Sequence, residues 1–216
     1  PLHSSAASDV YKRQLKTTKI KVVLISFPHN PTTLTVTQEF YDRLVLLARA
    51  HNFLIVNDFA YSDVFFEGQR PPSLLYSDRE LTNSVELYSL TKGYSMAGWR
   101  VGFAVGNKEA IQSLTKLKSY IDYGTFQPIQ IASTVAINDL DTYPKEVSET
   151  YKERRLLVVE NLEEFGFDVY KSNATMFVWA KIPDSYKEKS MEFSLEILKK
   201  SNAVSYTHLT LPTNVA

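Results

Sequence analysis

The sequence contains no cysteine, and its four histidines are scattered along the chain. Without cysteine the protein forms no disulfide bonds and offers no thiolate ligands, so we expect no metal centre. No secretory signal opens the sequence, and a chain without disulfides is compatible with a reducing compartment. We therefore expect a cytoplasmic protein.

An excess of charge of one sign is also missing, because 24 lysine and arginine residues balance 24 aspartate and glutamate residues. We therefore expect no nucleic-acid partner and no binding to an anionic membrane surface. No apolar run reaches the roughly 18 residues that a bilayer span requires. With 216 residues, 44% of them hydrophobic, the chain can bury a sizeable core. A small-molecule site is the expectation that remains.

Short apolar segments that suit buried strands are the first feature present. They are residues 20–27, 53–56, 85–90 and 101–105. The first two are separated by a stretch of helical periodicity, which is typical of parallel strands joined by a crossover helix. Only about ten residues separate the last two, so we expect the fourth strand to be antiparallel to the third. The predicted fold class is α/β with a mixed, mostly parallel sheet.

Helical periodicity predicts the elements between and after these strands. Thr35 and Gln38 have the spacing of a capping box, and the helix they would open runs to Asn52. Further helices are predicted at 111–121, at 127–140, and from 145 past 162 as one long helix.

Composition then shifts to shorter elements, which predicts a second, smaller domain. Strands are expected at 167–170 and 176–182, and a helix at 191–198. We predict a partial large domain at 15–143, and a bridging helix with a partial small α+β domain at 144–203. The two ends, 1–14 and 204–216, have no periodicity and resemble translated sequencing-adapter DNA. We expect both ends to be non-native and to lie outside the fold.

Polar side chains follow three of the predicted strands, at the edge where open α/β sheets bind ligands. They are Asn30, Asp58, Tyr61, Ser89, Lys92 and, shortly after the third strand, Arg100. Lys92 suits an amine that binds an aldehyde, while Ser89 and Arg100 suit an attached phosphate. This is the chemistry of pyridoxal 5'-phosphate (PLP).

Each remaining residue also fits one demand of that cofactor. Asp58 can stay ionised beside the pyridine nitrogen and keep it protonated, so that the ring accepts electrons. Asn30 and Tyr61 can donate hydrogen bonds to the ring oxygen. Lys92, once released by substrate, can move the α proton as the catalytic residue. Taken singly, four of these residues are better explained by structural roles. These roles are a helix cap for Asp58, a core aromatic for Tyr61, a surface ion-pair partner for Arg100 and a turn residue for Asn30.

Several motifs together resemble the fold-type I, class I/II aminotransferases, over about 190 residues. The motifs are Asn30-Pro31-Thr32, Asp58-x-Ala60-Tyr61, Ser89-x-Thr91-Lys92 and Gly98-Trp99-Arg100-x-Gly102. The resemblance implies a PLP-dependent transferase fold, amino-acid and 2-oxo acid substrates, and a homodimer.

Two further segments, 118–126 and 174–180, resemble the branch of glutamate-pyruvate (alanine) and LL-diaminopimelate aminotransferases. We expect alanine and glutamate as substrates, with LL-diaminopimelate as the alternative. A PLP-dependent lyase or synthase of the same fold, or an aminotransferase-like module of a regulator, would use the same residues.

The family pattern also contains parts that this sequence does not match. A phosphate-binding helix N-terminus and a ring-stacking aromatic would come before the first motif, and a carboxylate-binding arginine would come after residue 203. We therefore expect a fragment that is inactive by itself, whereas its parent is an enzyme.

Overall fold

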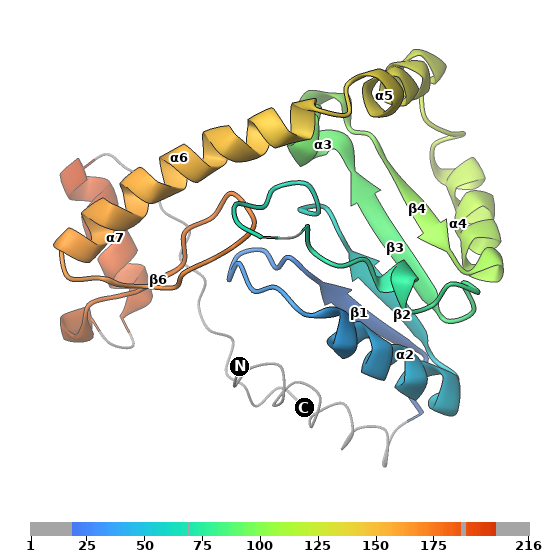
Figure 1. Cartoon of the computed structure of the whole chain (residues 1–216), viewed down its shortest axis with the longest axis horizontal. Coiled ribbons are helices and arrows are strands. Elements are labelled where there is room, and N and C mark those ends of the chain that lie inside the picture. Colours follow the sequence, from blue (N-terminus) through green and yellow to red (C-terminus); the bar gives the residue numbers. More distant parts are fainter. Residues whose placement is uncertain (1–18, 69, 187–188, 202–216) are drawn as a thin grey trace.

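The computed structural model describes residues 19–68, 70–186 and 189–201. Its main feature is a four-stranded sheet of order β1-β2-β3-β4 (Figure 1). The strands are β1 (Val22–Ser26), β2 (Leu54–Asp58), β3 (Ser84–Ser89) and β4 (Gly102–Gly106). The first three are parallel, and β4 is antiparallel to β3. This confirms the predicted α/β class, the mostly parallel sheet and the reversed fourth strand.

Helix α2 (Gln38–His51) crosses from β1 to β2 and supplies one side of the core. Its buried residues recur at helical spacing, and Tyr41, Leu44 and Ala48 pack in one cluster with Ile55 of β2. The helix ends as predicted at Asn52, which adopts the left-handed conformation and donates its N–H to the Ala48 carbonyl.

The predicted capping box at the start of α2 is wrong. The N-cap residue is Thr37, and its side chain forms no capping hydrogen bond. Gln38 instead donates from Nε2 to Ser77 Oγ at 2.6 Å, so its side chain reaches a distant loop and does not cap its own helix.

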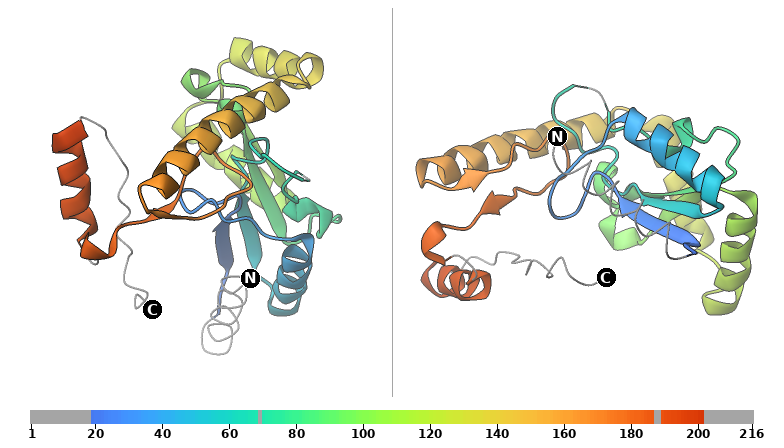
Figure 2. Two further views of the ribbon diagram at one scale, coloured as in Figure 1. Left: turned by 60° about the vertical axis from the view of Figure 1, so that its left-hand side comes forward. Right: turned by 90° about the horizontal axis from the view of Figure 1, so that it is seen from below.

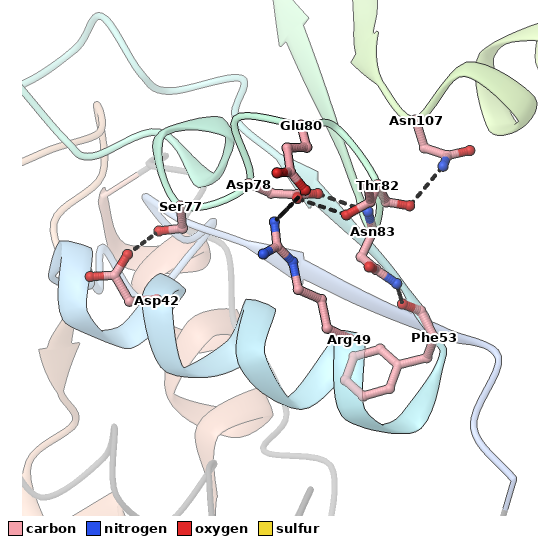
Figure 3. A network of polar contacts seen from close by, with 9 residues as sticks. All are labelled: Asp42, Arg49, Phe53, Ser77, Asp78, Glu80, Thr82, Asn83 and Asn107. Atoms are coloured by element: carbon pink, nitrogen blue, oxygen red, sulfur yellow. Dashed lines mark hydrogen bonds and ion pairs between the residues drawn. The ribbon is translucent and has the colours of Figure 1, made fainter.

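That loop contains a buried aspartate, Asp78, which joins α2 to the amino end of β3 (Figure 3). Its carboxylate accepts hydrogen bonds from Arg49 at 2.9 Å, from the Thr82 hydroxyl at 3.0 Å and from the Asn83 N–H at 2.8 Å. Burial raises the pKa of Asp78, but these hydrogen bonds outweigh burial and lower the pKa to about 2.

The second half of the chain leaves the sheet along a long helix (Figures 1 and 2). The elements after β4 are, in order, α4 (Lys108–Ile121), α5 (Gln127–Asp139), α6 (Tyr143–Glu164), β5 (Asp168–Val169), β6 (Ala180–Lys181), η3 (Asp184–Tyr186) and α7 (Ser190–Ser201). A short 3-10 helix, η1 (Leu74–Tyr76), lies earlier, between β2 and β3. Helix α6 runs toward β5, β6 and α7 at the far end of the molecule. Helices α4, α5, α6 and α7 overlap the predicted helices at 111–121, 127–140, from 145 past 162, and 191–198.

The predicted strand at 176–182 is correct only at 180–181, where β6 pairs with β5. The residues before it pair elsewhere: Ala174 bridges Phe65, and the Thr175 N–H donates to the Val64 carbonyl at 2.8 Å. These contacts join the segment just before the predicted strand to the loop after β2.

In the part of the chain that the structure describes, no helix is long and apolar enough to cross a membrane. The predicted tails, 1–14 and 204–216, lie outside the described residues. The division into domains at 15–143 and 144–203 stays a prediction.

Candidate active site

The carboxyl ends of β2 and β3 lie side by side, because the two strands are parallel and Asp58 pairs with Leu87. Asp58 is the last residue of β2, and its side chain is exposed with Oδ1 accepting the Ala60 N–H at 3.1 Å. Tyr61 follows in the turn and is buried. The strand thus places a carboxylate and a phenol at the sheet edge.

The next strand delivers the lysine. Ser89 ends β3 and is the N-cap of α3 (Leu90–Gly93), with its Oγ accepting the Thr91 N–H at 3.2 Å. Lys92 lies in this short helix, and its Nζ is 5.5 Å from the centre of the Tyr61 ring. The fold therefore brings Asp58, Tyr61 and Lys92 together, as the sequence predicts.

The electrostatic surroundings favour the neutral form of Tyr61. Burial raises the pKa of its hydroxyl, and the negative charge of Asp58 raises it further. Like an ordinary tyrosine, Tyr61 is a hydrogen-bond donor at neutral pH, and it lies next to the amine of Lys92.

Ser89 and Arg100 come from neighbouring segments, because Ser89 pairs with Gly102 and the Leu90 N–H donates to the Val101 carbonyl. Arg100 follows η2 (Ala97–Trp99) in the left-handed conformation, with φ 53° and ψ 51°. Its exposed guanidinium donates to the Ala97 carbonyl at 3.1 Å. Within the described residues no ion pair involves Arg100, so most of its donors can meet an anion.

Asn30 is less closely tied to the group. It follows β1, is exposed, and lies in a turn that the Thr33 N–H closes on the His29 carbonyl at 2.9 Å. Because β1 pairs in parallel with β2, Asn30 and Asp58 follow neighbouring strand ends. No hydrogen bond among the described residues links Asn30 to the other candidates.

The structure also adds residues that sequence reasoning missed. Asp63, two residues after Tyr61, is buried and accepts hydrogen bonds from Tyr88 and Arg70. A charged residue inside the otherwise largely apolar stretch 59–66 was the available signal.

A cavity of about 1390 Å³ lies beside this group. Asp63, Tyr88, Phe103 and Lys145 are among its lining residues, and none of the predicted site residues is. The candidate site is therefore defined by the side chains at the sheet edge, because none of them lines this cavity.

Comparisons with known proteins identify the family of the chain. The family model described as aminotransferase class I and II matches residues 4–214. Over 184 residues the chain is 40% identical to the glutamate-pyruvate aminotransferase AlaC of Escherichia coli, covering 85% of this chain and 45% of that protein. It is also 40% identical over 191 residues to the LL-diaminopimelate aminotransferase of Natranaerobius thermophilus. This match covers 88% of this chain and 49% of that protein.

Solved structures show the same fold. The apo structure of BacF from Bacillus subtilis superposes with a TM-score of 0.80 at 33% identity, covering 86% of this chain and 47% of that one. An aminotransferase from Staphylococcus aureus gives a TM-score of 0.81 at 32% identity, covering 89% of this chain and 50% of that one. The chain spans about half the length of the curated relatives it matches. By sequence and by fold, this chain belongs to the class I and II aminotransferase family.

Proposed function

We propose that this chain is part of a PLP-dependent aminotransferase that transfers an amino group between an amino acid and a 2-oxo acid. The observation that carries the proposal is the group at the ends of β2 and β3, where the amine of Lys92 meets the ring of Tyr61 beside Asp58. The names of the relatives, glutamate-pyruvate and LL-diaminopimelate aminotransferase, support amino-acid substrates.

The donor set fits PLP. An aldehyde requires an amine, which Lys92 supplies, and a pyridine nitrogen requires a carboxylate such as the exposed Asp58. A phosphate requires donors, and Ser89 and Arg100 come from paired segments. Tyr61 is a buried residue whose hydroxyl pKa is raised, so this hydroxyl is a donor that suits an anionic ring oxygen.

The proposed roles follow from these positions. When bound, PLP supplies an electron sink for the substrate's α carbon. Lys92 would bind the aldehyde, and its free amine would carry the proton to and from the α carbon. Asp58 would hold the ring nitrogen protonated, and Tyr61 with Asn30 would donate to the ring oxygen. Ser89 and Arg100 would hold the phosphate in place.

Alanine and glutamate are the substrates we propose, and LL-diaminopimelate is the second candidate. The second candidate is favoured by relatives of that name at 40% and 41% identity. A homodimer and a cytoplasmic location complete the proposal, on the family resemblance and on the lack of cysteine.

The test is an assay of a full-length parent containing this sequence, with L-alanine and 2-oxoglutarate and then with LL-diaminopimelate. Lys92→Ala should abolish turnover, and Lys116→Ala, which replaces an exposed lysine of α4, should not. The 216-residue chain alone should show little turnover. Normal activity of the parent carrying Lys92→Ala would overturn the proposal.

A further inference from the structure

Asp63 is a buried carboxylate that the proposed chemistry does not use. Only 9% of the residue is exposed. Its Oδ2 accepts the hydroxyl of Tyr88, and its Oδ1 forms an ion pair with the half-exposed Arg70. Burying a carboxylate costs desolvation energy even when it has two partners. A buried aspartate at this position therefore suggests a role in addition to packing.

The side chain of Asp63 also lies against the residue after Lys92. A Cβ atom added to Gly93 would stand 2.8 Å from both Cβ and Oδ2 of Asp63, closer than such atoms approach in proteins. Only glycine allows Asp63 to lie this close to α3. The absence of a side chain at Gly93 therefore leaves the space that the Asp63 side chain occupies.

Through these contacts Asp63 connects the segments that contain the two central residues of the site. Tyr61 stands two residues before Asp63 in the same turn, and Gly93 directly follows Lys92. Tyr88, which donates to the carboxylate, directly precedes Ser89. One side chain thus spans the gap between the end of β2 and the end of β3.

The backbone of Asp63 is held separately. Ser148 of α6 donates from Oγ to the Asp63 carbonyl at 2.6 Å and accepts the Phe65 N–H at 3.3 Å. The turn therefore has a fixed support, against which the carboxylate can hold α3.

Helix α3 needs such a support, because it contains a single turn, Leu90–Gly93. A helix that short has little stability of its own, and tertiary contacts decide where it lies. The amine of Lys92 can reach only as far as its four-carbon stem, so the position of this turn sets the region that the amine can occupy.

We infer that Asp63 is a positioning residue, which holds α3 against the turn after β2 and thereby sets the separation of the Lys92 amine from the Tyr61 ring. The inference rests on the proposed function for its meaning in catalysis. Its geometric part concerns only residues of this chain.

The geometric part is tested on the 216-residue chain without cofactor. The lysines are dimethylated with carbon-13 formaldehyde, and Lys92→Arg identifies the signal of Lys92. The ring current of Tyr61 should displace this signal, and Tyr61→Leu should remove the displacement. Asp63→Ala should move the signal toward its position in Tyr61→Leu, and Asp63→Asn, which keeps the volume and an acceptor for Tyr88, should largely restore it.

Asp78→Ala is the matched control, because it also removes a buried aspartate paired with an arginine, at the opposite end of β3. It should lower stability and leave the Lys92 signal in place. An unchanged signal in Asp63→Ala, or an equal change in both variants, would overturn the inference.

A second measurement separates this inference from the proposed function. Borohydride trapping of PLP on the chain, followed by peptide mapping, should label Lys92 about tenfold more slowly in Asp63→Ala. Equal labelling rates would overturn the catalytic part of the inference. If the unaltered chain shows no label at Lys92 but its NMR signal depends on Asp63, the proposed function fails and the positioning role stands.

Discussion

The Nζ atom of Lys92 lies 5.5 Å from the centre of the Tyr61 ring, although the two residues belong to different connections of the sheet. A cation over an aromatic face is attracted by the ring's electrons, and burial keeps the phenol neutral. This pair is the most direct structural sign of a site.

Lys92 should be the lysine that reacts with PLP. Borohydride reduction of the chain in the presence of PLP, followed by peptide mapping, should place the label on Lys92, because the fold sets this amine beside Tyr61 and Asp58. Lys92→Ala should remove the label, and Lys116→Ala should not. Label on Lys108 or Lys116 in place of Lys92 would contradict the assignment.

Asp58 should control turnover more than cofactor binding. Asp58→Ala in a full-length parent should retain much of its PLP, since Lys92, Ser89 and Arg100 remain. Turnover should fall by roughly two to three orders of magnitude, the scale of losing an essential electrostatic partner. Absorbance titration with PLP and a coupled transaminase assay measure the two effects. Asp184→Ala, at an exposed position, is the control. Near-normal turnover of Asp58→Ala would refute the role.

Asp78 should stabilise the fold in a pH-dependent way. Its pKa in the folded protein is about 2, below the ordinary value of 3.8. The stabilisation is therefore complete above about pH 4 and is lost as the pH falls toward 2. A shift of this size corresponds to about 2 kcal/mol.

Urea unfolding of Asp78→Asn at pH 6 and at pH 2.5 tests this expectation. The difference in unfolding free energy from the unaltered chain should shrink at the lower pH. Glu80→Gln removes a weaker partner of Arg49, at 3.7 Å, and should change the unfolding free energy only slightly at both pH values. A difference that does not change with pH would show that the carboxylate's charge is unimportant.

Gly106 should tolerate no side chain. Its φ of 149° is unfavourable for other residues, and an added Cβ would lie 2.1 Å from the Ser84 carbonyl oxygen in the paired strand. Gly106→Ala should destabilise the chain by about 1–3 kcal/mol. Gly98→Ala is the control, because nothing lies within 4 Å of the added atom. Thermal unfolding of both variants should separate them by several degrees, and equal midpoints would contradict the prediction.

The sequence determined the parts of this protein that local patterns encode. Apolar runs are enough to find the strands, since strands of a mostly parallel sheet are rich in Val, Ile and Leu. The short connection before β4 is enough to reverse its direction, because a parallel crossover needs more residues. The sequence also shows which polar residues come at the end of each strand. This order assigns Asp58 and Lys92 to the same edge of the sheet.

Only the tertiary structure decided the contacts between distant segments. Gln38 has the spacing of a capping residue, yet its side chain reaches Ser77 because the loop before β3 folds over α2. Of the strand predicted at 176–182 only Ala180 and Lys181 form β6, and Ala174 just before it bridges Phe65 in the loop after β2. The burial of Asp63 depends on β3, α3 and α6 meeting around one turn. No window of sequence contains such pairs, because propensity and periodicity describe neighbours along the chain, whereas packing energy depends on neighbours in space.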